Sequence, residues 1–444
     1  MPTNDHALTG FDSPRILIVG AGPVGLFLAL KLAQSGINST VIEKEDSTSK
    51  LPRACGHAGI VQHEFAKIGI YDKIKAMGGF ISVGPCWRKP LIDNDSGGKD
   101  LGEMVANFKK HKTVDPSMPP GSGTLHFPQA KLSELLLKEA VSTGRVEVRF
   151  NSDLESIQDN IDDTVSITVK DMTTGSSFSL SGTYLVGADG ATSKTRKLLD
   201  IPFAGYTWDR KLLATDVLIY NQPGEESPHP TSFIMDETHF GVITPLMEPK
   251  QGTRSLWRYT IGLPVNDPRS NDELLGPEYV ESIYENYMPG PRPLDYEITN
   301  KSIYSIHQRL ASTMRRGRVL LAGDAAHICN PFGGLGLNTG FLDVMALHDS
   351  LVMILKEGYS DELLDIYSDE RRRSFQMFVD PMSTYNLLRV ISKDAEKTTE
   401  DDWYFRALKN GNRRVLKSLE KQVSENWATD MRAILRADGD EMQL

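Results

Sequence analysis

A glycine-rich turn near the N-terminus, set between two apolar segments, constrains the fold of this chain more than any other feature. The unbroken apolar run at 15–20 predicts a buried parallel strand, because strands covered on both faces are apolar throughout. The segment at 24–34 is apolar around most of its surface and is followed by Gly36, which predicts a buried helix. A second strand is predicted at 38–44. Together these segments predict a βαβ unit, the start of an α/β fold.

The turn itself has the spacing G-x-G-x-x-G, with Gly20, Gly22 and Gly25 between the predicted strand and helix. Gly20 permits the tight turn, Gly22 lets a pyrophosphate approach the backbone, and Gly25 lets helix and strand pack closely. The helix N-terminus offers amides and partial positive charge to the phosphates. Glu43, 23 residues beyond Gly20, can accept hydrogen bonds from both ribose hydroxyls, and its neighbour Lys44 is included among the expected cofactor-binding residues. This context predicts a dinucleotide site and does not distinguish FAD from NAD.

The middle of the chain differs in character from the two ends. Between residues 201 and 300, prolines, aromatic residues and alternating apolar patterns predict a mostly antiparallel sheet. A buried strand at 318–323 and a long helix at 337–356, ended by Gly358, follow it, and the chain from 361 is charged and helical. Earlier in the chain, a helix is predicted at 131–140 and strands at 145–150, 164–170 and 183–187. The two ends therefore look like one α/β fold interrupted by an insertion.

Composition excludes several classes of partner. The formal net charge is −10, which argues against nucleic acid or an anionic membrane as the main partner. The three cysteines, Cys55, Cys86 and Cys329, have no C-x-x-C spacing, so neither a disulfide framework nor a metal site is indicated. No apolar signal core lies in 1–13, and no stretch approaches the roughly 18 apolar residues of a membrane span. We expect a cytoplasmic protein without a transmembrane segment.

Two further motifs lie where predicted strands end. Asp189 and Gly190 follow one strand, and Gly323 and Asp324 end another. The second motif continues into a glycine-rich stretch at 331–338, which opens the long helix. Ligands of open α/β folds gather at the carboxyl ends of the strands, so Asp324 is placed to accept hydrogen bonds from a ligand.

With the N-terminal glycine loop, these motifs resemble the group A flavoprotein monooxygenases, the para-hydroxybenzoate hydroxylase and phenol hydroxylase superfamily. The resemblance covers most of the chain, with three independent motifs in the right order. Trp208 and the stretches at 307–309 and 329–334 look more closely like a fungal subgroup of small-phenol hydroxylases. The resemblance implies that the chain binds FAD, and no recognised flavinylation sequence is present, so we expect the FAD to be non-covalent.

The resemblance carries cofactor roles onto particular positions. Asp324 would hold the flavin ribitol, and the element at Asp189 would be shared between FAD and the nicotinamide cofactor. The amides and positive helix end of the glycine-rich stretch would stabilise negative charge on the reduced flavin. The further positions assigned to FAD are Arg53, Gln129, Gly323, Gly333, Gly334, Gly336, Leu337 and Asn338.

Each of these positions also has a purely structural explanation. Asp324 could cap a short turn, and Asp189 could belong to an ordinary Asp-Gly turn. The glycine-rich stretch could be a plain loop before a helix. Arg53 could form a surface salt bridge, and Gln129 could simply be the first residue of a helix.

The predicted fold class is α/β, with a discontinuous Rossmann-like FAD-binding domain, an inserted and mostly antiparallel β-sheet substrate domain, and a helical C-terminal segment. The FAD-binding domain is assigned 1–89, 121–200 and 301–360, the substrate domain 201–300, and the C-terminal helices 361–444, with 90–120 as a surface excursion or part of the substrate domain.

The resemblance implies an enzyme that uses NAD(P)H and O2 to hydroxylate a small phenol or another electron-rich aromatic substrate. Bound FAD would supply the redox chemistry, while the protein positions the ring, excludes water and helps to deprotonate a phenol. No second glycine motif between a strand and a helix is present, so NAD(P)H is expected to bind transiently across the flavin cleft. Decarboxylating hydroxylation and epoxidation stay open. The long thioredoxin-like C-terminal domain of larger phenol hydroxylases is lacking, which leaves a homodimer open.

Substrate residues are expected in the β-rich domain, where the pattern is least informative. Arg210 or Arg258 could receive a carboxylate or phenolate. With His239 and Pro331, these two arginines make up the expected catalytic set. Every candidate also has a core role as its alternative, because aromatic residues on alternating strands are usually buried. The candidates by residue type are Tyr206, Trp208, Arg210, Tyr220, His239, Trp257, Arg258 and Tyr259.

Three other classes of protein share some of these features. An NAD-dependent dehydrogenase needs only the first motif and leaves Gly323, Asp324 and the glycine-rich stretch unexplained. A flavin-dependent halogenase would carry a W-x-W-x-I-P run, and none of the five tryptophans lies in one. A flavin-binding protein without catalytic activity stays open.

Overall fold

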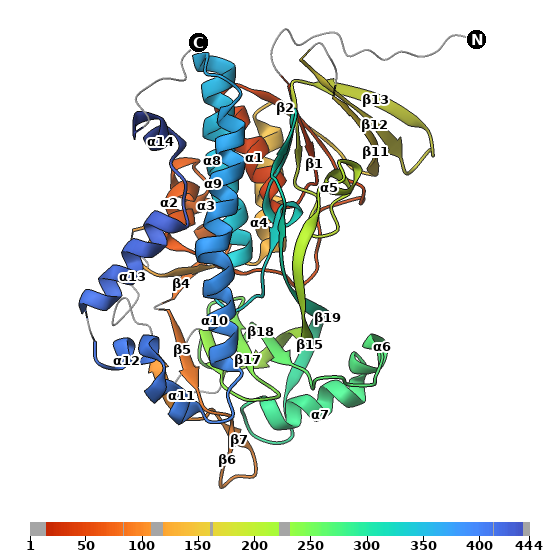
Figure 1. The fold of residues 1–444 in the computed structure, drawn as a ribbon. Coiled ribbons are helices and arrows are strands. Elements are labelled where there is room, and N and C mark those ends of the chain that lie inside the picture. The colour runs from red at the N-terminus through yellow and green to blue at the C-terminus, as the bar shows by residue number, and fades with distance from the viewer. Residues whose placement is uncertain are drawn as a thin grey trace.

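The computed structural model describes residues 15–82, 84–107, 119–159, 163–221, 231–411 and 413–437. Two large sheets lie at opposite ends of the molecule, and a column of C-terminal helices runs along both (Figure 1). None of the helices in this described part is long and apolar enough to cross a membrane.

The first sheet joins segments that are far apart in the sequence. Its strand order is β10-β2-β1-β14-β21-β20, parallel except for the pair β20 and β21. The central strand β1 pairs with β2 and with β14, which is the arrangement that the βαβ pattern predicted. The bounds are β1 Arg15–Val19, β2 Asn38–Ile42, β10 Val146–Arg149, β14 Tyr184–Gly187, β20 Arg315–Arg316 and β21 Val319–Leu321.

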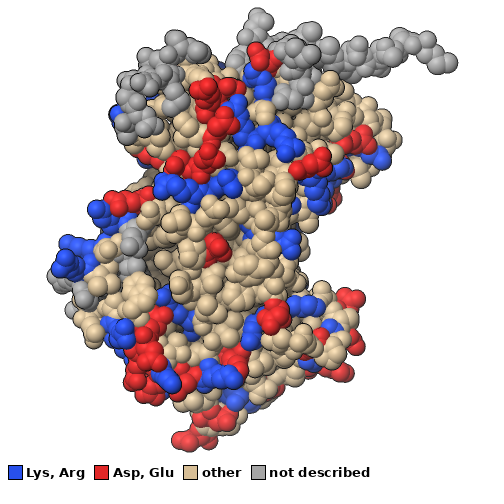
Figure 2. Space-filling view, in the orientation of Figure 1, with Lys and Arg blue, Asp and Glu red and all other residues tan. Residues whose placement is uncertain are grey.

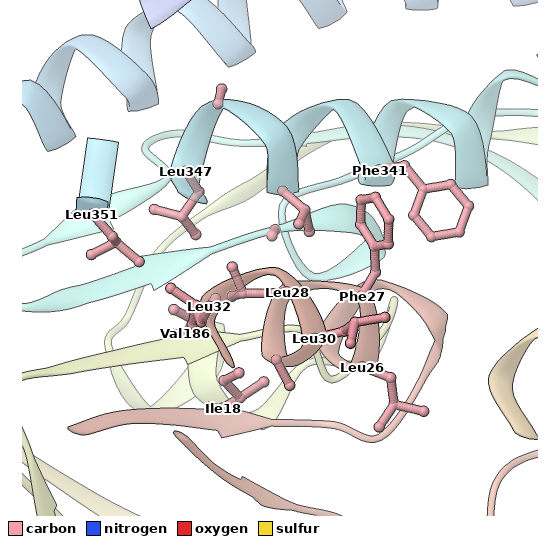
Figure 3. Close-up of a cluster of buried hydrophobic side chains, with 14 of the residues drawn as sticks. Ile18, Leu26, Phe27, Leu28, Leu30, Leu32, Val186, Phe341, Leu347 and Leu351 are labelled. Atoms are coloured by element: carbon pink, nitrogen blue, oxygen red, sulfur yellow. The ribbon is translucent and has the colours of Figure 1, made fainter. Parts of the chain in front are cut away.

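Helices cover this sheet and form its core. Helix α1 (Pro23–Gln34) lies between the sheet and α8 (Leu335–Glu357), as Figure 3 shows. The rings of Phe27 and Phe341 meet with centroids 4.9 Å apart, and both side chains are fully buried. Gly358 ends α8 in a left-handed conformation, as the sequence predicted, because glycine adopts that conformation without a Cβ clash.

Smaller elements surround the first sheet. A three-stranded antiparallel sheet packs beside it through apolar residues of β1 and β12. The bounds are β11 Ser152–Asp159, β12 Val165–Asp171, β13 Ser177–Gly182, β3 Gly56–His57, β4 Phe80–Ser82, β9 Thr124–His126, α2 Gly59–Lys67, α3 Tyr71–Ala76, α4 Gln129–Ser142, α5 Lys194–Leu198, a 3-10 turn η1 Gly323–Ala325 and β22 His327–Ile328.

The second sheet has the order β22-β19-β15-β18-β17-β16-β5-β8 and is antiparallel except between β16 and β5. Its two long strands, β15 and β19, pair from one end of the molecule toward the other. The boundary predicted after residue 300 falls inside β19, and β8 brings part of the 90–120 stretch into this sheet. The domain limits stay a prediction. The bounds are β5 Pro85–Arg88, β8 Met104–Asn107, β15 Phe203–Tyr220, β16 Thr231–Ile234, β17 Gly241–Pro245, β18 Arg254–Gly262 and β19 Tyr296–Ala311.

The remaining elements are helical or very short. Helix α9, the π-helical turn η2 and α10 form the continuous column in Figure 1. The bounds are β6 Ile92–Asp93, β7 Lys99–Asp100, α6 Asn271–Leu274, α7 Pro277–Tyr287, α9 Leu363–Ser374, η2 Phe375–Val379, α10 Asp380–Val390, α11 Ala395–Asp401, α12 Trp403–Lys409, α13 Arg413–Asn426 and α14 Met431–Ala437. The predicted α/β class with C-terminal helices is confirmed.

Candidate cofactor and substrate site

The glycine loop before α1 combines close packing with one open position. A Cβ atom on Gly20 would lie 2.5 Å from the Ala188 carbonyl oxygen, and Gly20 has a φ of +107°. A Cβ on Gly25 would lie 2.1 Å from the Gly20 carbonyl oxygen. A Cβ on Gly22, the N-cap of α1, would meet nothing within 4 Å. Gly20 and Gly25 therefore let the chain pack, while Gly22 leaves the helix N-terminus open to a phosphate.

Glu43 lies directly beside this loop. Its Oε2 accepts a hydrogen bond from the Ala21 amide at 2.8 Å, and its Oε1 accepts one from the Glu45 amide at 3.1 Å. These bonds hold the carboxylate in one orientation at the end of β2. Lys44 is exposed, and its Nζ lies 3.4 Å from Glu45 Oε1. The structure therefore brings Glu43 to the glycine loop and leaves Lys44 on the surface.

The side chain of Asp189 is used within its own turn. Its Oδ1 accepts a hydrogen bond from Ser193 Oγ at 2.6 Å, and its Oδ2 accepts bonds from the Thr195 amide at 2.9 Å and Oγ1 at 3.0 Å. Its Cα lies 3.0 Å from where a Gly20 Cβ would be. The backbone of Asp189 therefore shapes the glycine loop, while its carboxylate orders the start of α5.

Asp324 follows β21 in the turn η1, and its side chain is exposed. The surrounding protein nevertheless raises the pKa of its carboxyl by desolvation, against the attraction of His327 and Arg53. The N-cap of the turn η1 is Ala322, so Asp324 does not cap that turn. No residue in the described part of the chain donates a hydrogen bond to this carboxylate. A ligand hydroxyl is the kind of donor that this group lacks.

The glycine-rich stretch makes a left-handed entry into α8. Gly333 and Gly334 have φ values of +101° and +64°, and a Cβ on Gly334 would meet nothing within 4 Å. The Gly334 amide donates to the carbonyl of the exposed Pro331 at 3.1 Å, and the half-buried Gly336 and Leu337 form the first turn of α8.

Asn338 fixes the start of this helix to the segment around β3. Its Oδ1 accepts a hydrogen bond from the Ala58 amide at 2.9 Å. Its Nδ2 donates to the carbonyl oxygens of Gly56 at 3.1 Å and Gly334 at 2.6 Å. The side chain is thus a structural tie that holds the helix N-terminus in place beside β3.

Arg53 and Gln129 lie on neighbouring segments. The Gln129 amide, at the first residue of α4, donates to the Ala54 carbonyl at 2.9 Å. The Arg53 side chain is exposed, and its positive charge opposes the rise that desolvation causes in the pKa of Asp324. Arg258 Nη1 donates to the Arg53 carbonyl oxygen. The loop that follows β2 therefore carries a charge that acts on Asp324 and is tied to the second sheet by Arg258.

One face of the second sheet is turned toward these loops. Phe332, in the glycine-rich stretch, packs against Phe233 and Phe240 with ring centroids 6.1 Å and 5.5 Å away. Arg258 lies on the same face and forms a bidentate ion pair with Asp216, at 2.7 Å from Nε to Oδ1 and 2.9 Å from Nη2 to Oδ2. Both side chains are almost completely buried. Asp216 thus compensates the charge of Arg258.

A tyrosine that the sequence did not single out shares this face. Tyr304 of β19 pairs with Leu212 of β15, and Arg258 of β18 pairs with Asp216 of β15. Because Leu212 and Asp216 are an even number of residues apart on one strand, Tyr304 and Arg258 lie on the same face of the sheet. Burial raises the pKa of Tyr304 to about 12, although Arg258 opposes the rise. Tyr304 is therefore a neutral phenol at physiological pH. Its register with Arg258 follows from strand pairing, for which the sequence carries no signal.

Three predicted substrate residues lie on the other face. Trp257 and Tyr259 are buried in the cluster beneath α7. His239 Nδ1 lies 3.0 Å from the Gly262 carbonyl, its ring centroid is 4.4 Å from that of Tyr287, and burial lowers its pKa. The structure does not bring these residues to the cofactor loops, because alternate residues of a strand face opposite sides of a sheet.

The other candidates lie along β15. Arg210 Nη1 donates to the Glu237 carbonyl at 3.1 Å, and its guanidinium carbon lies 5.7 Å from the Phe240 ring centroid. Tyr206 and Trp208 are neighbours with ring centroids 5.6 Å apart, whereas Tyr220 is exposed at the far end of the strand. Arg210 thus borders the aromatic cluster that includes Phe332.

An open helix N-terminus at Gly22, a fixed acceptor at Glu43 and a carboxylate at Asp324 that receives no hydrogen bond from the described residues define a nucleotide-binding α/β protein. The chain belongs to the FAD binding domain family, which it matches over residues 14–381. These residues fit FAD: Gly22 would admit the diphosphate, Glu43 the adenosine ribose and Asp324 the ribitol. FAD supplies the electron transfer and oxygen activation, and the protein binds and orients it.

The chain is similar to several monooxygenases over nearly its whole length. It is 31% identical over 397 residues to para-nitrophenol 4-monooxygenase of Pseudomonas sp. strain WBC-3, covering 88% of this chain and 91% of that protein. It is 31% identical over 415 residues to 6-hydroxy-3-succinoylpyridine 3-monooxygenase HspB of Pseudomonas putida, covering 92% and 95%. The crystal structure of p-nitrophenol 4-monooxygenase PnpA from Pseudomonas putida superposes with a TM-score of 0.78 at 29% identity, covering 92% and 98%.

These likenesses confirm the predicted class, an FAD-dependent aromatic monooxygenase, and do not favour a dehydrogenase or a halogenase. They also confirm the superfamily that the three motifs resemble. The relatives named here are bacterial, so the fungal subgroup is not part of this finding.

Proposed function

We propose that this enzyme uses NAD(P)H and O2 to hydroxylate a small phenol whose other ring substituents are uncharged. The observation that carries the proposal is the ion pair of Arg258 and Asp216, because the Asp216 carboxylate already neutralises the guanidinium that a substrate carboxylate would need. The likeness to two nitrophenol monooxygenases supports the same substrate class.

The surroundings of the ion pair are apolar. The described residues of the aromatic and aliphatic cluster on this face include Trp87, Leu212, Phe233, Phe240, Ile306 and Phe332. Arg210, at the border of the cluster, is tied to the Glu237 carbonyl and to the Phe240 ring. A wall of this kind binds an aromatic ring through apolar area and disfavours an unpaired carboxylate, which would have to be stripped of water.

Within this proposal the four expected catalytic residues have different parts. Arg258 is a positioning residue, because it ties the second sheet to the Arg53 loop through a carbonyl. Arg210 and Pro331 border the aromatic cluster and the start of α8. His239 lies on the opposite face of the sheet, so its catalytic part stays a prediction.

We propose that NAD(P)H is received beside the Asp189 turn. Arg309 of β19 has a buried Nε with no partner among the described residues, and its Nη2 donates to Thr207 Oγ1 at 3.1 Å. Its charge lowers the pKa of Arg196 after the larger effect of burial, and Arg196 Nη2 donates to the Ala191 carbonyl at 2.9 Å. Arg309 is therefore a cation near the turn, and its Nε is an N–H donor without a partner among the described residues that could serve an anionic cofactor.

The test compares two substrates with the same phenol ring, one with a charged and one with an uncharged substituent. Purified holoenzyme would be given 4-hydroxybenzoate and its methyl ester, and NAD(P)H consumption and product mass would be measured for each. We expect the ester to be hydroxylated with a kcat/KM at least about tenfold above that of the acid, the factor that corresponds to about 1.4 kcal/mol. A preference for the acid would refute the proposed substrate class.

A substitution makes the comparison specific to the ion pair. Asp216→Asn removes the carboxylate that neutralises Arg258, so the guanidinium can attract a substrate carboxylate. The ratio of kcat/KM for the ester to kcat/KM for the acid should then fall toward one or below it. Asp295→Asn is the matched control, because Asp295 pairs with Arg254 on the exposed surface. The same shift in both variants would mean that Asp216 has no particular part in selecting the substrate.

Three finer expectations complete the proposal. The fungal small-phenol hydroxylase subgroup is proposed on Trp208 and the stretches at 307–309 and 329–334. A cytoplasmic location is proposed on the use of cysteine. A homodimer is proposed on the exposed side chains of Met377 in η2 and of Tyr385 and Leu388 in α10.

A further inference from the structure

A buried carboxylate lies directly beneath the turn that carries Asp324. Asp343 of α8 has an exposed side-chain fraction of 0%. Its Oδ2 accepts hydrogen bonds from the Gly323 amide at 2.9 Å and from His327 Nε2 at 2.7 Å. Its Oδ1 accepts one from Arg371 Nε at 2.7 Å. Burial alone would raise the pKa of Asp343, but His327 and Arg371 hold it below the usual value, so the group is ionised.

The arginine of this pair reaches in the opposite direction to a segment between α13 and α14. Arg371 is fully buried, and its Nη1 donates to the Trp427 carbonyl at 2.7 Å and to Thr429 Oγ1 at 3.2 Å. Ser374 Oγ donates to the Asn426 carbonyl at 2.6 Å. Trp427 and Thr429 are thus held by the same guanidinium that holds Asp343, and Asn426 is held by Ser374.

A second tie joins this segment to α8. Trp427 Nε1 donates to Thr339 Oγ1 at 2.8 Å, one helical turn before Asp343. The indole is buried against Phe378, with ring centroids 5.7 Å apart. The segment therefore contacts the helix that starts at the glycine-rich stretch, as well as the ion pair under Gly323.

The placement of the ion pair points to a purpose beyond packing. Replacing a buried ion pair with apolar residues is often neutral or stabilising, so stability alone is weak grounds for having one. Here one oxygen of the pair accepts the amide of Gly323, a residue with a φ of +60° whose Cβ would lie 3.0 Å from Val24 in α1. The bond fixes the backbone immediately before Asp324.

We propose that Asp343 and Arg371 are positioning residues of the FAD site and that residues 426–429 complete the network that holds them. Docking of this C-terminal segment and binding of FAD are then coupled through Gly323, and by linkage each strengthens the other by the same factor. This inference concerns the FAD site alone and is independent of the proposed substrate.

The direct test is hydrogen exchange of the amides at 426–437 in the holoenzyme and in the apoprotein made from it. We expect FAD to slow exchange there by about fivefold or more, the lower end of typical couplings. In Arg371→Met the apoprotein should exchange faster in this segment, and FAD should no longer change the rate. Equal exchange with and without FAD in the unaltered protein would overturn the proposal.

A milder variant keeps the test informative if Arg371→Met fails to fold. Trp427→Phe removes the indole N–H and keeps most of the ring, so we expect it to fold and to bind FAD several-fold more weakly by flavin fluorescence titration. Trp403→Phe is the matched control, because Trp403 is exposed on α12. FAD affinity in Trp427→Phe equal to that of the control would also overturn the proposal.

Discussion

Asp324 shows how one residue can report a ligand. Its carboxylate lies at the end of a buried strand, where burial raises its pKa and no described residue donates to it. The Ala325 and Ala326 side chains beside it are buried and small. A carboxylate in this setting is stabilised once a ligand hydroxyl donates to it.

Asp324→Ala is expected to lose FAD rather than to unfold. The variant should purify largely as apoprotein, and added FAD should raise its melting temperature much less than in the unaltered protein, because a weaker ligand stabilises less. Absorbance of the bound flavin and thermal melting with and without FAD measure both effects. A folded, fully yellow variant with normal NAD(P)H oxidation would refute the assigned role.

Glu43→Gln should weaken FAD on the order of tenfold, with little change in the chemistry. An amide still accepts a ribose hydrogen bond, but the charge assistance is lost, and charge-assisted bonds contribute roughly 1.5–3 kcal/mol against about 1 for neutral ones. Titration of apoprotein with FAD gives the affinity. Glu45→Gln, two residues on and exposed, is the control. Equal affinities in the two variants would mean that Glu43 is not the ribose ligand.

At the scale of elements, local patterns predicted what local forces determine. The strands β1, β2 and β21 and the helices α1, α4 and α8 were predicted to within a few residues, because their apolar runs and glycine ends act over short distances. The placement of Gly22, Glu43 and Asp324 at the ends of these elements could be predicted for the same reason, while their roles as cofactor ligands stay predictions.

Contacts between distant elements could not be predicted in this way. Arg258 and Asp216 meet across 42 residues, and their pairing depends on the register of β15 with β18. Asp343 and Arg371 meet because α8 packs against α9. Such contacts depend on tertiary packing, and no periodic pattern in a single sequence predicts them.

The small sheet of β3, β9 and β4 should make stability fall in acid. Burial lowers the pKa of His57 to about 4 and that of His126 to about 3 from the ordinary value of 6.5. As the pH falls, the unfolded chain therefore takes up a proton on each histidine before the folded chain does. The contribution of the two neutral histidines to the free energy of unfolding is complete above pH 6.5 and is lost as the pH falls toward 4. The loss is up to about 1.4 kcal/mol per pH unit for each histidine.

Urea unfolding of the holoenzyme at several pH values measures this slope. His126→Gln should remove about half of it, since glutamine can keep a hydrogen bond to Ser82 without titrating. His63→Gln, on α2, is the control, and a slope that is the same in all three proteins would contradict the role of the buried pair.

At the scale of the whole molecule, the column of α9, η2 and α10 lies across the face shown in Figure 2. Charged residues of both signs border this face, and its middle is a broad, mostly uncharged area that contains a small acidic patch. Met377 and Tyr385 on the column are 70% and 59% exposed, and Leu388 is also exposed. An apolar surface of this kind on a helix commonly marks a contact with another protein.

We expect a second copy of this chain to cover that surface. Tyr385→Lys should then shift the protein from dimer to monomer in analytical ultracentrifugation, with FAD still bound. Tyr220→Lys, exposed at the far end of β15, is the control. An unaltered protein that sediments as a monomer at micromolar concentration would contradict this expectation.

In the proposed reaction, this chain uses bound FAD to place one atom of O2 on a phenol whose other ring substituents are uncharged. Mass spectrometry of the product formed from methyl 4-hydroxybenzoate under isotopically heavy O2 tests this reaction most directly. We expect one heavy oxygen atom in each product molecule, NAD(P)H consumed in proportion, and no product from the Asp324→Ala apoprotein. Consumption of NAD(P)H with no heavy oxygen in the phenol would contradict it.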